Sequence, residues 1–294
     1  MMNLWTFFES FNNREKAIAV WLLLFFVWIF FRKDTRTAVF NVLKVFFDKK
    51  IISIVLGMLL YTLLIVFSLN KFGLWDAFLL KDTIFWVIGT ALVLLFSTDK
   101  ATQDIAFFKV TVFNAFKLVV ILEFIINFYA FNFWVEMVLI PSLVIIGGMS
   151  ALTETKVEYK TVKRFINSIL AFIGFFLVIY AGGNVIANYQ TFVNLKNLNT
   201  LITPPLLTLF YIPYLYLFAL VMAYETLFVR LGIFIKDKRL LDFTKQRILL
   251  LCTLNLGKLN LFAQTYTREF MELNSKSAVR KLMVDFQLKN KKKL

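Results

Sequence analysis

The sequence contains no histidine and only one cysteine, Cys252, in 294 residues. Ser-His-Asp and Cys-His catalysis, histidine-liganded zinc or haem and a disulfide within the chain are therefore excluded. No glycine-rich phosphate loop occurs either, so we expect neither an enzyme nor a bound cofactor or metal. Cys252 stands in an apolar segment, and we interpret it as a packed core residue.

Charged residues are also scarce. They make up 17% of the chain, against 60% hydrophobic residues that include 36 Phe, whereas soluble domains are near one quarter charged and half apolar. This composition excludes an ordinary soluble domain and predicts an integral membrane protein. We expect an all-α fold: a polytopic bundle of transmembrane helices with in-plane amphipathic helices and a C-terminal cytoplasmic helical region.

An apolar helix needs about 20 residues to cross roughly 30 Å of hydrocarbon. Seven apolar runs approach this length: 17–31, 51–69, 83–96, 118–131, 134–152, 165–187 and 204–228. The first has only 15 residues before charges begin, so six spans is the main alternative to seven.

The net charge of +15 is unevenly distributed along the chain. Of the 33 Lys and Arg residues, 28 lie in four segments: 32–50, 99–117, 153–164 and 230–294. Positive loops are retained in the cytoplasm, so we expect the N-terminus outside and the C-terminus in the cytoplasm of a bacterial inner membrane. The same distribution makes the anionic cytoplasmic leaflet the expected partner and disfavours nucleic acid.

Three regions follow from this topology. Residues 1–16 contain aromatic side chains among polar ones and lack the features of a cleavable signal, so they are predicted to be an external, interfacial segment. A fraying terminus is the alternative. Residues 17–235 form the transmembrane domain, and residues 236–294 form a basic cytoplasmic tail.

Two segments, 39–48 and 101–116, have apolar residues at helical spacing and lead into the next span. We call them elbow helices, because they are predicted to lie on the cytoplasmic membrane surface. The order span, elbow, span thus occurs twice. It indicates a weak internal repeat, in which residues 83–152 correspond to residues 17–98. Such repeats are found among transporters. The alternative is that a sequence of Phe, Leu and Val aligns easily with itself.

Two polar residues inside the fourth span are costly in lipid. Glu123 lies roughly 9 Å into the span, and Asn127 follows one turn later on the same face. They are candidates for an ion or proton site or a polar pore lining. A satisfied interhelical hydrogen bond or a protonated carboxyl is the alternative. Glu225, at the inner end of the last span, is a further candidate for such a polar site, although its position favours an interfacial ion pair. Glu136 is expected to be solvated at the outer surface.

Candidate gating positions lie in the last two spans. Pro213 should kink the seventh span, which is predicted to begin at Pro204 and Pro205. Gly182 and Gly183 are candidates for a break in the sixth span. Close packing between helices is the alternative explanation for these small residues.

The tail is not a plain basic extension. Residues 236–294 show three amphipathic helices, separated at Gly257 and near Asn274. These helices need a covering surface: one another, a neighbouring subunit, the anionic leaflet or a soluble partner. The candidate contacts to lipid or partner are Arg280, Lys281, Lys289, Lys291, Lys292 and Lys293.

These features favour a gated conduit or membrane effector for ions or small solutes, controlled through the tail. One alternative is a secondary transporter that uses an intramembrane carboxylate. Another is a membrane anchor or scaffold that holds a cytoplasmic protein. A homo-oligomer is compatible with the first of these functions.

Overall fold

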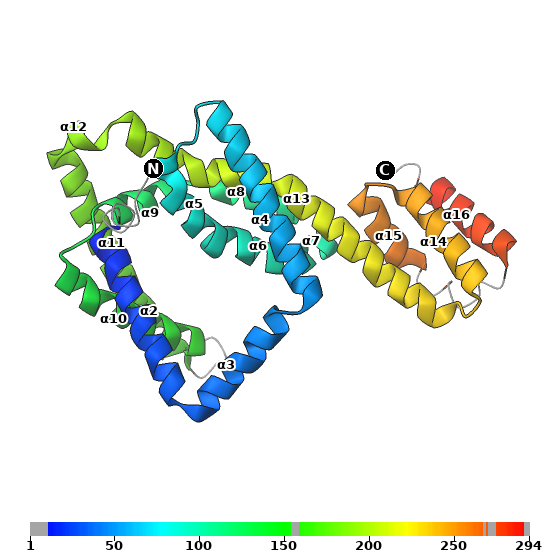
Figure 1. The fold of residues 1–294 in the computed structure, drawn as a ribbon, viewed down its shortest axis with the longest axis horizontal. Coiled ribbons are helices and arrows are strands. Elements are labelled where there is room, and N and C mark those ends of the chain that lie inside the picture. Colours follow the sequence, from blue (N-terminus) through cyan, green and yellow to red (C-terminus); the bar gives the residue numbers. More distant parts are fainter. Residues whose placement is uncertain (1–10, 154–158, 267–268, 270–274, 291–294) are drawn as a thin grey trace. The chain divides into compact units, whose positions relative to one another are not determined.

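The computed structural model describes residues 11–153, 159–266, 269 and 275–290 (Figure 1). Every regular element in this part of the chain is a helix, as predicted. The chain divides into two compact units. Unit 1 comprises residues 1–84 and 116–205, and unit 2 comprises residues 85–115 and 206–294.

Six stretches among the described residues are long and apolar enough to cross a membrane: Lys49–Lys71, Ala77–Phe96, Ala106–Phe128, Phe133–Thr153, Lys160–Ala187 and Leu195–Phe234. They overlap the last six of the seven predicted runs. The first run, 17–31, lies in α2 (Asn13–Phe31), whose first turn adds the charges of Arg14, Glu15 and Lys16. Because α2 has only 19 residues, these charges fall within the length of about 20 residues that a crossing needs.

Unit 1 contains the early helices and those of the middle of the chain. Its elements are α2, α3 (Lys33–Phe46), α4 (Lys49–Lys71), η1 (Ala77–Leu79), the first part of α5 (Leu80–Trp86), α9 (Leu118–Phe128), α10 (Phe133–Thr153), α11 (Lys160–Ala187), α12 (Tyr189–Phe192) and the first part of α13 (Leu195–Phe234). Helix α2 packs along α10, and α11 packs on both α9 and α10 (Figure 1).

Side-chain caps define where several of these helices begin. Asn12 and Glu15 form a capping box, in which each side chain accepts a hydrogen bond at 2.8 Å from the backbone N–H of the other. Asp48 caps α4 in a similar way by accepting from the N–H of Lys50 at 2.9 Å. Side-chain hydrogen bonds therefore fix the position at which α2 begins.

The first predicted elbow is a helix, α3, and none of its residues is buried. The second, 101–116, is divided into α7 (Thr98–Gln103) and α8 (Ala106–Ala115), because Asp104 ends the first helix and caps the second. Helix α8 also belongs to the candidate crossing Ala106–Phe128. The placement of both segments on a membrane surface remains a prediction.

Unit 2 contains the end of the third predicted span, both parts of the second elbow, most of α13 and the tail. Its elements are the end of α5, the π-helix η2 (Val87–Ala91), α6 (Leu92–Phe96), α7, α8, the remainder of α13, α14 (Lys238–Cys252), α15 (Leu256–Tyr266) and α16 (Lys276–Asn290).

The prediction that the helix of the last span begins at Pro204 and Pro205 is wrong. Helix α13 is 40 residues long and begins at Leu195, where the Asn194 carboxamide oxygen accepts from the N–H of Asn197 at 2.8 Å. This earlier cap starts the helix two turns sooner than the prolines would. The helix then continues through all three of its prolines to Phe234.

The three tail helices pack against one another, with α14 in contact with both α15 and α16. Apolar side chains from all three are buried, among them Ile248, Leu259, Phe262, Val279 and Phe286. Cys252 is buried as predicted. The first break falls at Thr253–Asn255, and Gly257 lies inside α15. The three tail helices thus bury part of their apolar faces against one another, which was one of the covering surfaces considered from the sequence.

Candidate functional site: polar contacts along helix α13

The first polar contacts of α13 in unit 2 are with the candidate crossing Ala77–Phe96. The indole Nε1 of Trp86 donates to the hydroxyl of Thr208 at 2.9 Å, and the hydroxyl of Tyr211 donates to the carbonyl of Ala91 at 3.4 Å. The rings of Trp86 and Tyr211 meet edge to face, with centroids 5.5 Å apart. All three side chains are buried, so each polar group is satisfied within the unit, as a low-dielectric environment requires.

Ala91 closes the π-helix η2, a single wide turn between α5 and α6. A π-turn alters the regular ladder of helical hydrogen bonds and recurs at functional sites. Here its last carbonyl receives the buried hydroxyl of Tyr211. The irregular turn and α13 are thus joined by a specific contact.

The next polar contacts connect α13 to the tail. The hydroxyl of Tyr216 donates to the carbonyl of Leu254 at 2.7 Å and accepts from the N–H of Leu256 at 3.1 Å. The hydroxyl of Tyr224 donates to the carbonyl of Thr253 at 2.8 Å. These three bonds hold the turn between α14 and α15, which we call the tail turn (Thr253–Asn255), against the middle of α13.

Thr253 has a positive φ of 47°, which is rare for a β-branched residue because its Cβ crowds the backbone. This conformation ends α14. The hydrogen bonds from Tyr216 and Tyr224 fall on this turn. They supply partners for carbonyls at a helix end, which have no partner inside the helix.

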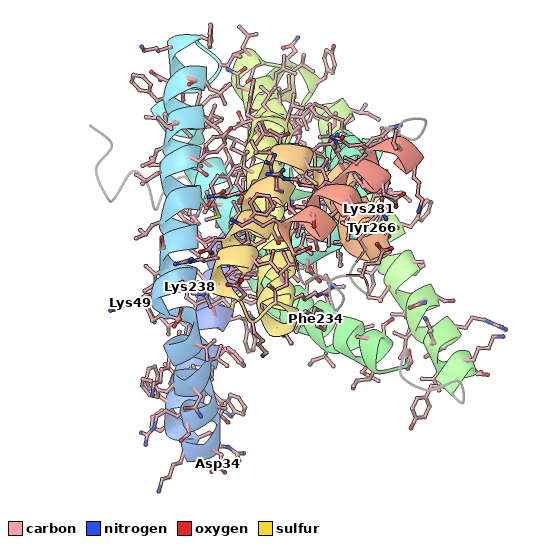
Figure 2. All side chains as sticks on the ribbon, turned by 90° about the vertical axis from the view of Figure 1, so that its right-hand side faces the viewer. Asp34, Lys49, Phe234, Lys238, Tyr266 and Lys281 are labelled. Atoms are coloured by element: carbon pink, nitrogen blue, oxygen red, sulfur yellow. The ribbon has the colours of Figure 1, made fainter. Side chains whose placement is uncertain are left out.

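Helix α14 runs back along α13 in the opposite direction. A Cβ at Gly232 would lie 3.9 Å from the side chain of Leu241, and the ammonium of Lys245 lies 5.6 Å from the ring centre of Phe228. The contacts therefore move toward the start of α13 as α14 proceeds. Figure 2 labels Phe234 and Lys238, which end α13 and begin α14.

Three aromatic rings form the centre of the tail core. Phe262 and Tyr266 of α15 pack against Phe286 of α16, with ring centroids 5.1 and 5.7 Å apart. The hydroxyl of Tyr266, labelled in Figure 2, donates to the carboxylate of Asp285 at 2.8 Å. Burial and this hydrogen bond raise the pKa of Tyr266 to about 12, so the ring stays neutral and keeps its donor at physiological pH.

Unit 1 has a different polar cluster. The guanidinium of Arg14 forms a salt bridge with Glu136 at 2.9 Å, and the Glu136 side chain is fully buried. The carboxylate also accepts from the N–H of Phe131 at 2.9 Å. The prediction of a solvated Glu136 is therefore wrong, because the start of α2 supplies a cation that covers it.

Asn127 joins this cluster, as one of the predicted polar residues. Its carboxamide oxygen accepts from Arg14 at 3.1 Å, and its carbonyl accepts from Asn12 at 2.9 Å. Glu123 does not join it: its side chain is exposed. Within the part of the chain that the structure describes, Glu123 has no hydrogen-bond or salt-bridge partner. Glu225 belongs to unit 2, where it is exposed on α13.

The predicted gate residues differ in their surroundings. Pro213 is exposed and lies between Tyr211 and Tyr216 on an unbroken α13. Helix α11 also continues unbroken through Gly182 and Gly183. A Cβ added to either glycine would meet no atom within 4 Å among the described residues. Close helix packing at these two glycines is thus not seen.

Of the predicted lipid or partner contacts, those that the structure describes lie on α16. Lys281, labelled in Figure 2, is exposed, and the guanidinium carbon of Arg280 lies 5.8 Å from the ring centre of Phe243. Lys289 forms a salt bridge with Asp285 at 2.8 Å. Lys291, Lys292 and Lys293 lie outside the described residues.

A mainly apolar cavity of about 450 Å³ opens beside α9 and α12 in unit 1. Ile121, Phe124, Phe192 and Leu198 line it, together with Asn194 and Asn197. Neither Glu123 nor Asn127 is among its lining residues. No group of three potential metal ligands comes together in the described residues.

The tyrosines of α13 were not singled out by their sequence pattern. A usable signal existed, because Tyr211, Tyr216 and Tyr224 stand in a long apolar run. A tyrosine hydroxyl inside such a run needs a partner when buried. The partner itself cannot be deduced from spacing, since Leu254 is 38 residues from Tyr216.

No protein-family model, curated protein or solved structure matches the chain. The class therefore follows from the fold alone. The described chain is all-helical, and its six long apolar helices are compatible with an integral membrane protein.

Proposed function

We propose that the chain is a gated conduit or membrane effector whose tail controls the conformation of α13. One observation carries this proposal: Pro213 lies between Tyr211, which bonds to the π-helix, and Tyr216, which bonds to the tail turn. Proline removes a backbone hydrogen bond inside a helix and weakens it locally. A movement of the tail turn would therefore act on α13 next to a point that proline weakens.

The proposed membrane topology has seven spans, with α2 as the first. Helix α2 runs parallel to α10, since Asn13 bonds to Phe131 and Trp21 bonds to Met137. In the predicted topology both helices cross from outside to inside. A parallel pair is what that topology requires.

Contacts within unit 1 also support the proposed sidedness. The predicted external segments meet one another: Glu15 pairs with Lys81 at 3.1 Å, and the ammonium of Lys196 lies 3.7 Å from the ring centre of Phe78. Arg14 reaches the end of α9 through Asn127. These residues come from sequence positions that the charge distribution places on one side of the membrane.

The secondary transporter has less support, because it predicts Glu123 inside a polar site. The polar cluster of unit 1 instead contains Arg14, Asn127 and Glu136. An anchor or scaffold would use the exposed cations of α16, which a gated protein could use equally.

The proposal is tested by ion flux through proteoliposomes that contain Tyr216→Phe/Tyr224→Phe. The double variant removes the two hydroxyls that bond to the tail turn, with a net loss of about 1 kcal/mol for each hydroxyl. A loss of 1–2 kcal/mol shifts a two-state equilibrium roughly five- to thirtyfold, so we expect a basal leak that rises by a factor in this range.

Tyr129→Phe is the matched control, since the Tyr129 hydroxyl has no partner among the described residues. It should keep the wild-type leak. Equal leak from the double variant, the wild type and empty liposomes would contradict the conduit.

A further inference from the structure

The end of α14 and the tail turn carry an exposed apolar surface. Leu250 and Leu254 are 73% and 64% exposed, and Leu249 is 44% exposed. The neighbouring face of α13 is also apolar and exposed, at Leu217 and Val221. We call the three leucines the turn leucines (Leu249, Leu250 and Leu254).

The tail hairpin consists of α14, the tail turn and α15, and its charged residues are concentrated in the first part of α14. The first ten residues of α14 contain Lys238, Arg239, Asp242, Lys245 and Arg247. From Ile248 to Tyr266 the only charged residue is Lys258. The hairpin is thus charged at its base and apolar at the tail turn, which is the pattern of a segment that reaches from water into a membrane interface.

The position of the tail turn along α13 matches this pattern. Helix α13 has 40 residues, about twice the number that a crossing needs. The apolar part of α13 lies between Lys196 and Arg230, and Tyr216 lies past its middle, toward Arg230 and the predicted cytoplasmic side. Tyr216 bonds to Leu254 and Leu256, so the tail turn lies at the same depth.

The second elbow places the tail turn at this depth independently. The ring of Phe108 in α8 lies 5.4 Å from that of Tyr216. A Cβ on Gly257 would lie 2.6 Å from the side chain of Ile105, which precedes α8. The elbow 101–116 is predicted to lie on the cytoplasmic membrane surface. Tyr216, which bonds to the tail turn, and Gly257, which follows it, both lie against this elbow.

We propose that the turn leucines insert into the acyl-chain region of the inner leaflet, so that the tail hairpin contacts lipid directly. The partner surface is the bilayer itself, since the apolar patch continues that of α13 and the cations of α14 remain at the water side. This inference rests on the proposed topology of α13. It deepens the proposed function by making lipid packing a signal that the tail turn passes to Tyr216.

The test uses single spin labels on the full-length protein in anionic liposomes, in a Cys252→Ala background. Leu250→Cys carries the label, and collision rates with oxygen and with a water-soluble nickel chelate are measured. Oxygen concentrates in hydrocarbon and the chelate in water. We expect the oxygen-to-nickel ratio at position 250 to be several-fold above that at Lys281→Cys, and similar to that at Leu63→Cys in α4.

Each other outcome overturns the inference. A ratio equal to that of Lys281→Cys would place the turn in water. Low access to both reagents would mean that protein, such as a second copy of the chain, covers the leucines. Leu254→Cys supplies a second label on the same patch should Leu250→Cys disturb folding. The flux experiment does not depend on this result, so failure of lipid contact and failure of the conduit can be distinguished.

Discussion

The polar cluster around Arg14 in unit 1 and the polar contacts of α13 in unit 2 differ in chemistry. Unit 1 uses opposite charges at helix ends, with Arg14 on Glu136 and Lys81 on Glu15. Unit 2 uses neutral donors along the middle of α13, with Trp86, Tyr211 and Tyr216 as examples. A buried charge that loses its partner is strongly destabilising, whereas a neutral hydrogen bond can be exchanged at small cost. The difference suggests a fixed end in unit 1 and a contact that can rearrange in unit 2.

The largest expected effect comes from removing the buried carboxylate of unit 1. Glu136→Ala leaves Arg14 without its counterion and should lower the free energy of unfolding by about 3–5 kcal/mol. The measurement is unfolding by SDS in mixed micelles, followed by circular dichroism. Glu123→Ala, at an exposed acid on α9, is the matched control and should be near neutral.

A double variant sharpens this prediction. Arg14→Met/Glu136→Leu replaces both charges with apolar groups and should recover much of the loss. If Glu136→Ala lowered the free energy of unfolding no more than Glu123→Ala does, the charged cluster would not be what holds α2 to α10.

A smaller effect is expected from the neutral contacts of unit 2. Thr208→Val keeps the shape of the side chain but removes the acceptor of the Trp86 indole. The buried N–H then lacks this partner, which should cost about 1–3 kcal/mol. The same SDS titration, read by tryptophan fluorescence, measures the change.

Thr200→Val is the matched control on the same helix, since the hydroxyl of Thr200 bonds to the carbonyl of Lys196 in its own helix. A cost for Thr208→Val equal to that of Glu136→Ala would remove the contrast between the two units.

The smallest effect concerns acid pH and the tail. Hydrogen bonds from Lys289 and Tyr266 hold the pKa of Asp285 below its usual value of 3.8. A depressed pKa in the folded state stabilises above the unfolded pKa, and this stabilisation is lost as the pH falls through the folded value. The tail should therefore lose a little stability below about pH 4.

Asp285→Asn should flatten this part of the pH profile, measured by limited proteolysis of the tail between pH 2 and pH 6 with an acid-tolerant protease. Asp242→Asn, at an exposed acid of α14, should keep the wild-type profile. An unchanged profile in Asp285→Asn would show that Tyr266 does not depend on this carboxylate.

The helices themselves were largely predictable, because apolar runs and amphipathic spacing are local properties of the chain. The tail shows this: its three helices are found, although the first break lies at Thr253–Asn255 and not at Gly257. The break lies earlier than predicted because Thr253 adopts a positive φ. A prediction from the sequence expects this conformation at a glycine and not at a threonine.

The polar sites were predicted only in part. Asn127 was identified by its depth in a span, and it does bond to Arg14. Glu136 was assigned to water because it lies beside Trp134 at the predicted outer surface. Its partner, Arg14, is 122 residues away, and a pairing over that distance depends on how α2 packs against α10.

The sequence by itself determined the composition that favours a membrane, the helical elements and the uneven placement of its cations. These follow from residue type and local spacing, which set hydrophobicity and helix periodicity. Only the tertiary structure decided that Glu136 is buried, that α14 returns along α13 and that Tyr216 meets Leu254. Such contacts join residues far apart in the chain, and packing geometry selects them from many partners that composition alone would allow.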